Sequence, residues 1–584
     1  MTRRSFILAV VAILAVGATL RLAWLRSDPA TFASVGVVWH DEGAWTHNAR
    51  NRALWGEWRT DAWNPMFLAP VFTALEYGAF RIAGVGTWQA RLVPAVSGLA
   101  AVLLLIVGLH ALAGRRTALI GGLLLATNYV FVMWNRAALM ESTMTAAIVA
   151  AWAAYALAER RPWWGVLAGV CVVIAWFTKA AAAFFLAAIV IDAVFTLALG
   201  HGRLRSWLRV PEIPTPAARK AAMLTLAGIA AATAIAAVVF VVPYWTEYRF
   251  YNWQMSVTRK PSYTLQDFKD RATWLPLVQG LFTRMWIVVA ASAVAMAGIA
   301  SRWRTASPAE RLLVLWVLVG FAELIVHDAG NERRYVMFVP ALIALASLLA
   351  GSTRSLFDQG LVAASWMTRL LAAPLLLFLG YIVMGSLLRL ALLDDVLAGN
   401  LKPAVRLSAG AAALACAVLL WRWRPMTALL GRAVVPIRAV GVVLVIAVGW
   451  NLYEYAGWAR QRAERNYLAS VELGRTLPPG TLVQGKLANG LALENRIRPL
   501  FVGNGFGNYE DRLQRDDARY ILTYDLPRVG YESSDGSGLI QGILDRYPRQ
   551  RVIATFDVDE TPFVDRAVLI DKFPAPQLGS HARD

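Results

Sequence analysis

Four short clusters of charged residues in this 584-residue chain contain groups suited to proton transfer and anion binding. The first is Trp39-His40-Asp41-Glu42-Gly43. Its two adjacent carboxylates could act as a general base or bind a cation. The structural alternative is a solvated loop in which Asp41 caps the following helix. The residue types alone allow both interpretations.

The second and third clusters each follow an apolar run. In Asn135–Glu141, Arg136 and Glu141 could form a structural ion pair, or Glu141 could face the same cavity as Asp41. In the third cluster, Lys179 follows Thr178. A lysine at such a position binds a phosphate or extends its ammonium group to lipid headgroups.

The fourth cluster, residues 327–335, contains Arg333, Arg334 and Tyr335. The two arginines lie in a short loop on the outer face, where the positive-inside rule disfavours them. A guanidinium group matches phosphate oxygens in a fork, so this placement favours an anionic partner. Arg249, in another loop of the same face, is a further candidate.

The elements that must position these clusters are membrane helices. The chain is 58% hydrophobic, whereas soluble domains are about 45–50% apolar. A spanning helix needs roughly 20 apolar residues. We predict thirteen spans, near residues 5–25, 88–113, 117–134, 140–158, 163–178, 181–199, 221–243, 277–300, 309–327, 335–351, 366–390, 404–421 and 435–453.

Basic residues predict the orientation. The net charge is +19, but the arginines gather in short loops between apolar runs, which is a topology signal and not the signature of a nucleic-acid-binding protein. With a cytoplasmic N-terminus, every cytoplasmic loop is basic, and an odd number of spans places the C-terminus outside. The loops carry Arg115 and Arg116, Arg160 and Arg161, residues 203–220, residues 302–311, and residues 422–438.

Three segments are predicted outside the membrane on the far face: the loop 26–87, the loop 244–276, which carries Arg249, and everything after about residue 455. The loop 26–87 is rich in tryptophan and contains two amphipathic stretches, Gly43–Trp58 and Met66–Ile82, typical of interfacial helices. We divide the chain into a membrane domain, 1–455, and an extracytoplasmic domain, 456–584. The second is predicted to be a small α/β domain, because β-rich runs alternate with helical ones. The β-rich runs are Thr481–Gln484, Pro499–Val502, Tyr520–Thr523, Val552–Phe556 and Ala567–Ile570; the helical runs are Tyr509–Asp517 and Gly538–Arg546.

Cys171 and Cys416 both lie in apolar runs, so no cysteine-based zinc site or nucleophile is predicted.

The order of several short motifs resembles a known family. Residues 1–350 contain, in sequence, Asp41-Glu42-Gly43-Ala44, Arg91-Leu92-Val93-Pro94, the segment Arg136–Glu141, Thr178-Lys179 and Arg334-Tyr335. This pattern resembles the membrane-embedded GT-C glycosyltransferases. Within them it is similar to the bacterial dolichyl-phosphate-mannose protein mannosyltransferase-like enzymes, which include the lipid A aminoarabinose transferases.

The resemblance implies an inverting transfer of a monosaccharide from a polyprenyl-phosphate donor to a hydroxyl of a lipid, glycan or protein, on the non-cytoplasmic face of a bacterial inner or plasma membrane. It implies that Asp41 is the base, with Glu42 its partner and Glu141 the second acid. Lys179, Arg333, Arg334 and Tyr335 would face the carrier phosphate. Some members use a divalent metal and others do not, so a metal stays possible and no cofactor is assigned.

One motif departs from the family, and one other function class fits part of the sequence. Relatives place a lysine before a proline in the first external loop, where this chain has Ala69-Pro70 or Asn64-Pro65, so the usual phosphate contact is missing or replaced. A transporter or flippase of lipid-linked saccharides would explain the helices and the outer charges. It would not explain the long first loop that starts with Asp41-Glu42, or the exported domain. A non-catalytic subunit is a third interpretation.

Overall fold

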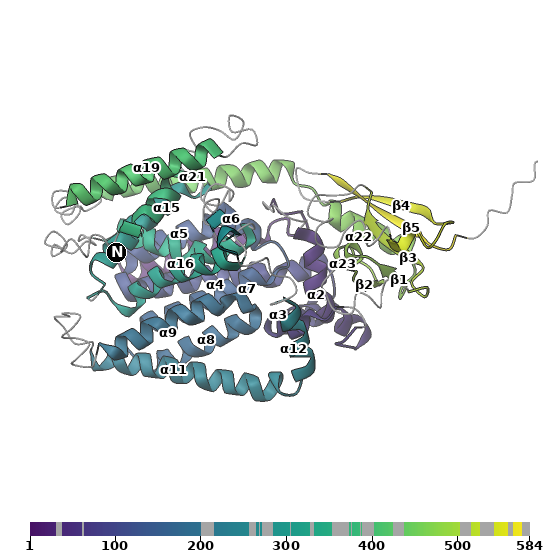
Figure 1. Cartoon of the computed structure of the whole chain (residues 1–584), viewed down its shortest axis with the longest axis horizontal. Coiled ribbons are helices and arrows are strands. Elements are labelled where there is room, and N and C mark those ends of the chain that lie inside the picture. Colours follow the sequence, from purple (N-terminus) through teal and green to yellow (C-terminus); the bar gives the residue numbers. More distant parts are fainter. Residues whose placement is uncertain are drawn as a thin grey trace, which may run out of the picture.

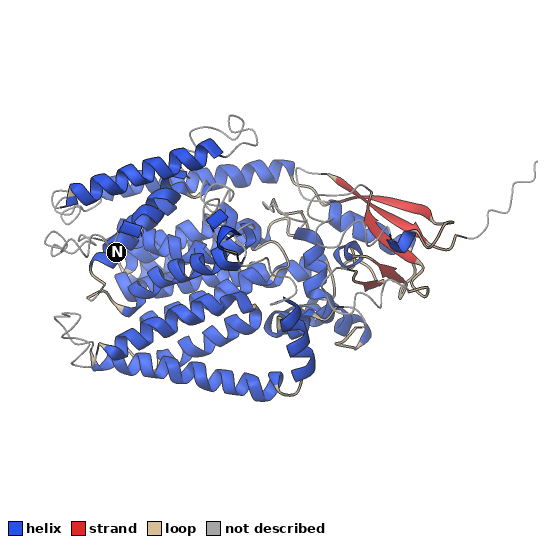
Figure 2. Cartoon of the chain, viewed as in Figure 1, coloured by secondary structure: helices blue, strands red, loops and turns tan. Residues whose placement is uncertain are grey.

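The computed structural model describes the chain except for residues 31–37, 61–62, 200–214, 256–263, 268, 271–283, 304, 328–331, 353–372, 375, 386, 388–401, 424–436, 503–514, 526–541, 559–563 and 575–584. Its helices form an elongated bundle, with a small sheet at one end and the N-terminus at the other (Figure 1). Helices and strands are segregated, since all of the strands lie in the part beyond the bundle (Figure 2).

Apolar sequences fold as helices here because a helix satisfies its own backbone hydrogen bonds, as lipid requires. The first half of the chain forms α1 (Arg3–Leu22), α2 (Val38–Trp55), η1 (Pro65–Phe67), α3 (Pro70–Ala83), α4 (Thr87–Ala113), α5 (Arg115–Thr127), α6 (Tyr129–Trp134), α7 (Met140–Ala158), α8 (Trp164–Thr178), η2 (Ala180–Ala182) and α9 (Ala183–Ala198). The second half adds α11 (Pro216–Ala236), η3 (Ala237–Val241), α12 (Trp245–Trp253), α15 (Trp286–Ser301), α16 (Pro308–His327), η5 (Glu332–Phe338), α17 (Val339–Gly351), α19 (Lys402–Trp421) and α21 (Ile437–Gln461).

These helices overlap the predicted spans, with one clear difference. Within the described residues, six helices are by themselves long and apolar enough to cross a membrane, and four shorter apolar helices accompany them. The predicted span 117–134 is not one helix: α5 ends at Thr127, and the Asn128 side chain accepts a hydrogen bond from the Phe131 amide to start α6. The span predicted at 366–390 is described only in part, and its described residues include the shorter apolar helix Leu376–Gly385.

Small residues allow close helix contacts in the bundle. Gly165 and Gly169 of α8 face α11, where a Cβ on Gly169 would lie 2.5 Å from the backbone nitrogen of Ile229. A Cβ on Gly228 of α11 would in turn lie 2.5 Å from the carbonyl oxygen of Val166. Glycines spaced in this way let helix backbones approach in a membrane, where apolar side chains gain nothing by leaving lipid.

The tail forms a five-stranded mixed sheet beside two helices, α22 (Arg465–Thr476) and α23 (Lys486–Gly490). The strand order is β2-β1-β3-β5-β4; β1 is parallel to β2 and β3, and β5 is antiparallel to β3 and β4. The strands are β1 (Leu482–Gln484), β2 (Arg498–Leu500), β3 (Tyr520–Tyr524), β4 (Arg551–Val558) and β5 (Asp565–Asp571). All five overlap the β-rich runs predicted from the sequence. The predicted helical run Tyr509–Asp517 lies mostly outside the described residues, and of the run Gly538–Arg546 residues 542–544 are helical.

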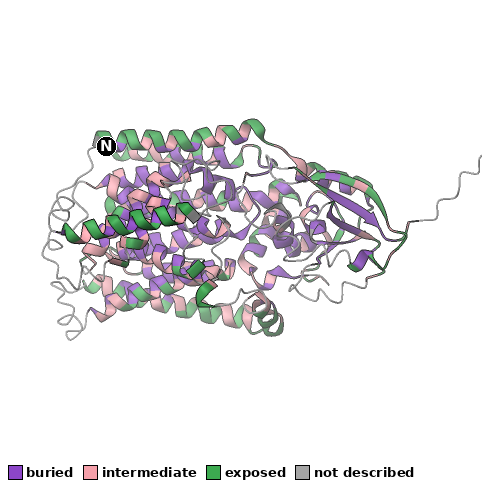
Figure 3. Ribbon diagram, turned by 45° about the horizontal axis from the view of Figure 1, so that its top comes forward, coloured by how far each residue is buried: buried purple, intermediate pink, exposed green. Residues whose placement is uncertain are grey.

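Helix α2 differs from the interfacial surface helix that its sequence predicts. Residues 42–50 are all buried, because α3 covers one side of the helix and α23 of the tail covers another. Figure 3 shows buried residues through the centre of the bundle and at its junction with the tail. The polar residues that suggested a solvated face instead pair inside this junction. Asn48 Nδ2, for example, donates to Asn64 Oδ1 at 2.8 Å.

Candidate active site

Four of the predicted residues meet in one ion-pair cluster. Asp41 lies in the first turn of α2, Glu141 in the first turn of α7, Lys179 at the end of α8, and Arg333 in η5. Arg333 Nη1 donates to Asp41 Oδ2 at 2.7 Å, and Arg333 Nε lies 3.0 Å from Glu141 Oε1. Lys179 Nζ also pairs with Glu141 Oε1. One guanidinium group therefore holds both carboxylates, which come from different helices.

Exposure differs across this cluster. The Glu141 side chain is 3% exposed, whereas that of Asp41 is 26% exposed. The Oε2 atom of Glu141 is buried and accepts no hydrogen bond from any described residue. Because ion pairs strengthen where water is excluded, Glu141 is held firmly by Lys179 and Arg333. Asp41 is the carboxylate that a ligand from outside reaches more easily.

Glu42 has a different environment from its neighbour. Its two carboxylate oxygens accept from Nε and Nη2 of Arg91 in α4, both at 2.8 Å, and Oε1 also accepts from the Ala138 amide at 2.7 Å. The remaining nitrogen of Arg91, Nη1, donates to the carbonyl oxygens of Arg26 and Ser27 at 3.0 and 2.9 Å. This bidentate pair ties α2, α4 and the loop before α7 together.

Arg136 does not pair with Glu141, so that structural interpretation of the second cluster is wrong. Its guanidinium donates to the carbonyl oxygens of Arg21 and Trp24, at 2.9 and 2.6 Å, and lies 4.5 Å from the ring centroid of Trp458. Carbonyls at a helix C-terminus lack partners within the helix, so Arg136 serves as a cap for α1.

The other predicted residues are placed as follows. Arg334 adjoins Arg333 and acts electrostatically on Glu141 and Lys179. Tyr335 is fully buried, with its ring beside Phe338 at 6.5 Å between centroids. Arg249 lies on the exposed face of α12. His40 belongs to the first turn of α2, and its side chain lies outside the described part of the structure.

Glu76 of α3 is a buried acid that sequence reasoning missed. Its side chain is fully buried, and neither carboxyl oxygen has a hydrogen-bond partner among the described residues. Burial, with a smaller contribution from the charge of Glu42, raises the pKa of the Glu76 carboxyl well above its usual range. This environment favours the neutral form of the Glu76 carboxyl. Its position in an apolar stretch between Leu75 and Tyr77 was the available signal.

A divalent cation would have few free ligands at this cluster. Among the described residues, no group of three or more His, Cys, Asp or Glu side chains is placed to hold a metal ion. The carboxylates of Asp41, Glu42 and Glu141 are each paired with a guanidinium or an ammonium group.

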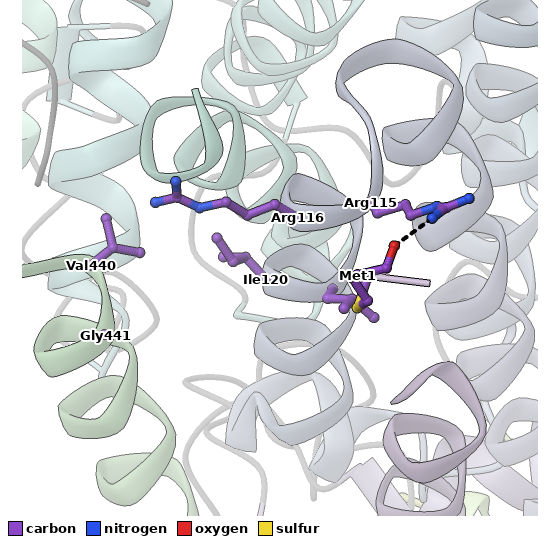
Figure 4. Close-up of a pocket in the computed structure, with 7 residues that line it drawn as sticks. Met1, Arg115, Arg116, Ile120, Val440 and Gly441 are labelled. Carbon is purple, nitrogen blue, oxygen red and sulfur yellow. Dashed lines mark hydrogen bonds between the residues drawn. The ribbon is translucent and has the colours of Figure 1, made fainter. Parts of the chain in front are cut away.

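A separate pocket of about 500 Å³ lies at the N-terminal end of the bundle (Figure 4). It is lined by Met1, Arg115, Arg116, Ile120 and Val440, among others. Arg115 Nη1 donates to the Met1 carbonyl at 2.8 Å. Since this end of the bundle is opposite the sheet (Figure 1), the pocket is not part of the Asp41 cluster.

Comparison with known proteins gives a family match and a fold match. The family model described as dolichyl-phosphate-mannose-protein mannosyltransferase matches residues 68–226. No curated protein matches the chain. The structure of ArnT from Cupriavidus metallidurans bound to undecaprenyl phosphate is similar with a TM-score of 0.52 and 16% identity, over 99% of this chain and 100% of that chain.

Two further solved structures are more distant. The apo oligosaccharyltransferase of Archaeoglobus fulgidus has a TM-score of 0.43 and 13% identity, over 93% of this chain and 71% of that one. The arabinofuranosyltransferase AftD from Mycobacteria has a TM-score of 0.46 and 14% identity, over 98% of this chain and 40% of that one. The family match and the ArnT fold are the matches that bear on this chain. Together they confirm the resemblance drawn from the motifs: residues 68–226 match the family model of the dolichyl-phosphate-mannose-protein mannosyltransferases, and the fold of the chain is similar to that of ArnT.

Proposed function

We propose that this protein is an inverting glycosyltransferase that moves a monosaccharide from a polyprenyl-phosphate donor to a hydroxyl of a lipid, glycan or protein, on the non-cytoplasmic face of the membrane. The observation that carries the proposal is the Asp41–Arg333–Glu141–Lys179 cluster, in which a partly exposed carboxylate lies beside fixed cations. Such a cluster holds a base for the acceptor and positive charge for the phosphate. The ArnT structure of the same fold contains undecaprenyl phosphate, which supports this class of carrier.

The charges of the cluster suit a phosphodiester. Lys179 and Arg333 pair with the carboxylates of Asp41 and Glu141, and Arg334 adjoins them and adds positive charge near Glu141. A cationic environment of this kind suits the single negative charge of a phosphate that links a lipid to a sugar. Fixed cations in a water-poor site stabilise the charge that develops on the leaving phosphate.

Arg333 connects phosphate binding to the release of the base. Its Nη1 atom is bonded to Asp41. A donor phosphate competes for the same guanidinium, because phosphate accepts from a guanidinium fork at least as well as a carboxylate does. Donor binding then frees the Asp41 carboxylate to accept a proton.

The transfer is a single displacement. The acceptor oxygen attacks the anomeric carbon while Asp41 takes the hydroxyl proton, and the bond from that carbon to the phosphate oxygen breaks with its electron pair. Polyprenyl phosphate leaves as the product, and the configuration at the anomeric carbon inverts. The free Oε2 atom of Glu141 is available to accept a hydrogen bond from a sugar hydroxyl. Glu42, already held by Arg91, positions Asp41 instead of touching the reacting atoms.

The test is to reconstitute the purified protein in vesicles with defined polyprenyl-phosphate sugars and a panel of acceptors. The proposal expects release of free polyprenyl phosphate in step with a glycosylated product of inverted configuration. Movement of intact donor between leaflets without its consumption would overturn it in favour of a flippase.

A further inference from the structure

The tail contacts the helix that carries Asp41 through a glycine. Gly43, two residues after Asp41 in α2, is buried against the backbone of α23. A Cβ at this position would overlap the carbonyl oxygen of Asn489, lie 2.5 Å from its carbonyl carbon, and lie 3.1 Å from the Cα of Gly490. Backbone atoms cannot rotate away as a side-chain end can, so only glycine fits here without a shift of α23 or α2.

A second contact lies two helical turns further along the same face of α2. Arg50 is fully buried, and its Nε atom donates to the carbonyl oxygen of Ala492 at 2.9 Å. Its Nη2 atom donates to the carbonyl oxygens of Asn495 and Ile497 at 3.0 and 2.9 Å. Three carbonyls of the tail thus bind one guanidinium of α2, and the planar fork fixes the direction of each bond.

Two more contacts attach the tail near the other end of α2. Asp28 accepts from the Arg465 amide at 2.9 Å and from Asn466 Nδ2 at 3.0 Å, and both donors belong to α22. The same carboxylate lies 3.8 Å from Nη2 of Arg91, the arginine that holds Glu42. Glu494 accepts from the Thr87 amide at the start of α4 at 2.6 Å. A shared apolar cluster, to which Leu493 of the tail and Ala49 of α2 both belong, completes this junction.

We infer that the tail is a positioning element of the active site, and that Gly43 and Arg50 are the residues through which it seats α2 so that Asp41 meets Arg333. This inference rests on the proposed function. The 2.7 Å bond between Asp41 and Arg333 depends on where α2 lies. A misplacement of about 1 Å in a catalytic group can cost roughly a hundredfold in rate.

The test is Gly43→Ala, with Gly78→Ala of α3 as the matched control, since a Cβ on Gly78 meets nothing within 4 Å. Turnover and donor KM are measured on purified full-length protein, together with amide hydrogen exchange of residues 486–500. Gly43→Ala is expected to lower kcat about tenfold or more, change donor KM less than about threefold, and raise exchange in that segment. Because a smaller folded fraction would also lower the apparent kcat and leave KM unchanged, kcat is calculated per folded protein, quantified by size-exclusion chromatography. Gly78→Ala should match the wild type in all three measurements.

Arg50→Lys provides a second variant should Gly43→Ala fail to fold. It keeps the charge but cannot reach three carbonyls in the plane of a guanidinium, and it should show the same split between kcat and KM. Wild-type kcat in either folded variant, or unchanged exchange in residues 486–500, overturns the inference and leaves the proposed function intact. Absence of any transfer by the wild-type protein overturns the proposed function itself, and this inference with it.

Discussion

Arg333 bonds to Asp41 and lies against Glu141, so its removal takes an ion-pair partner away from both carboxylates. We predict that Arg333→Gln raises donor KM by about tenfold to a hundredfold, because a charge-assisted contact is worth roughly 1.5–3 kcal/mol. The measurement is the donor concentration dependence of turnover. Arg475→Gln, on the exposed face of α22, makes the same chemical change outside the site and should leave KM unchanged. An unaltered donor KM in Arg333→Gln would remove this residue from the phosphate site.

The pairing of the carboxylates also bears on metal dependence. A divalent cation at Asp41 or Glu141 would have to displace a guanidinium or an ammonium group and then lie beside the remaining positive charges. We predict that dialysis against a chelator leaves turnover within about twofold of its starting value, and that added Mg²⁺ or Mn²⁺ does not raise it. Activity that is lost on chelation and restored by one cation would contradict this account of the site.

At the scale of single residues, the sequence predicted the charged residues of the cluster better than it predicted their ion-pair partners. Asp41, Glu141, Lys179 and Arg333 are charged residues at the ends of apolar runs, which is a strong local signal. Their pairing depends on how the helices pack, and no spacing along the chain encodes it. For the same reason the sequence suggested an Arg136–Glu141 pair, whereas Arg136 caps α1.

At the scale of elements, α3 carries Glu76, an acid whose neutral form folding favours. Because the pKa of Glu76 is raised, the folded protein holds this proton more tightly than the unfolded chain does. The free energy of unfolding therefore falls as the pH rises from the ordinary carboxyl pKa of about 4.5 toward the raised pKa. The fall is about 1.4 kcal/mol per pH unit.

Glu76→Gln is neutral at every pH and should remove this loss. We predict that its melting temperature falls less than that of the wild type between pH 5 and pH 8, so that the two curves separate as the pH rises. Glu472→Gln, on the exposed face of α22, should follow the wild-type curve. Parallel curves for the wild type and Glu76→Gln would mean that Glu76 is ionised in the folded protein.

Helix α2 shows why the packing of a helix was harder to predict than the helix itself. Its polar residues gave the pattern of a surface helix, and the helix does form over Val38–Trp55. Burial came from the tail, which lies more than 400 residues further along the chain and supplies the carbonyls that Arg50 binds. The predicted strands of the tail were easier, because β-branched runs between turn residues are a local pattern.

At the scale of the whole molecule, the basic N-terminal end and the sheet lie at opposite ends of the bundle (Figure 1). Arg160 Nη2 donates to the Ala111 carbonyl, and Arg115 donates to Met1, so the first two basic loops lie at the same end. From the positive-inside rule we expect this end to face the cytoplasm and the tail to face outward.

We predict that a reporter active only in the cytoplasm is silent when fused after Asp584 and active when inserted after Arg161. The second fusion controls for expression and for membrane insertion. The opposite pattern would place the Asp41 cluster on the cytoplasmic side and would contradict the proposed face of transfer.

The central claim is that Asp41 takes the proton of the acceptor, and turnover by purified Asp41→Asn protein tests it most directly. The substitution keeps the shape of the side chain and removes the base. Loss of a general base costs about 10²–10⁴ in rate, so kcat should fall by that factor while donor KM and melting temperature stay close to wild type. Asp557→Asn, on the exposed side of β4, is the matched control and should retain full activity. Asp41→Asn protein that transfers sugar at the wild-type rate would contradict the account.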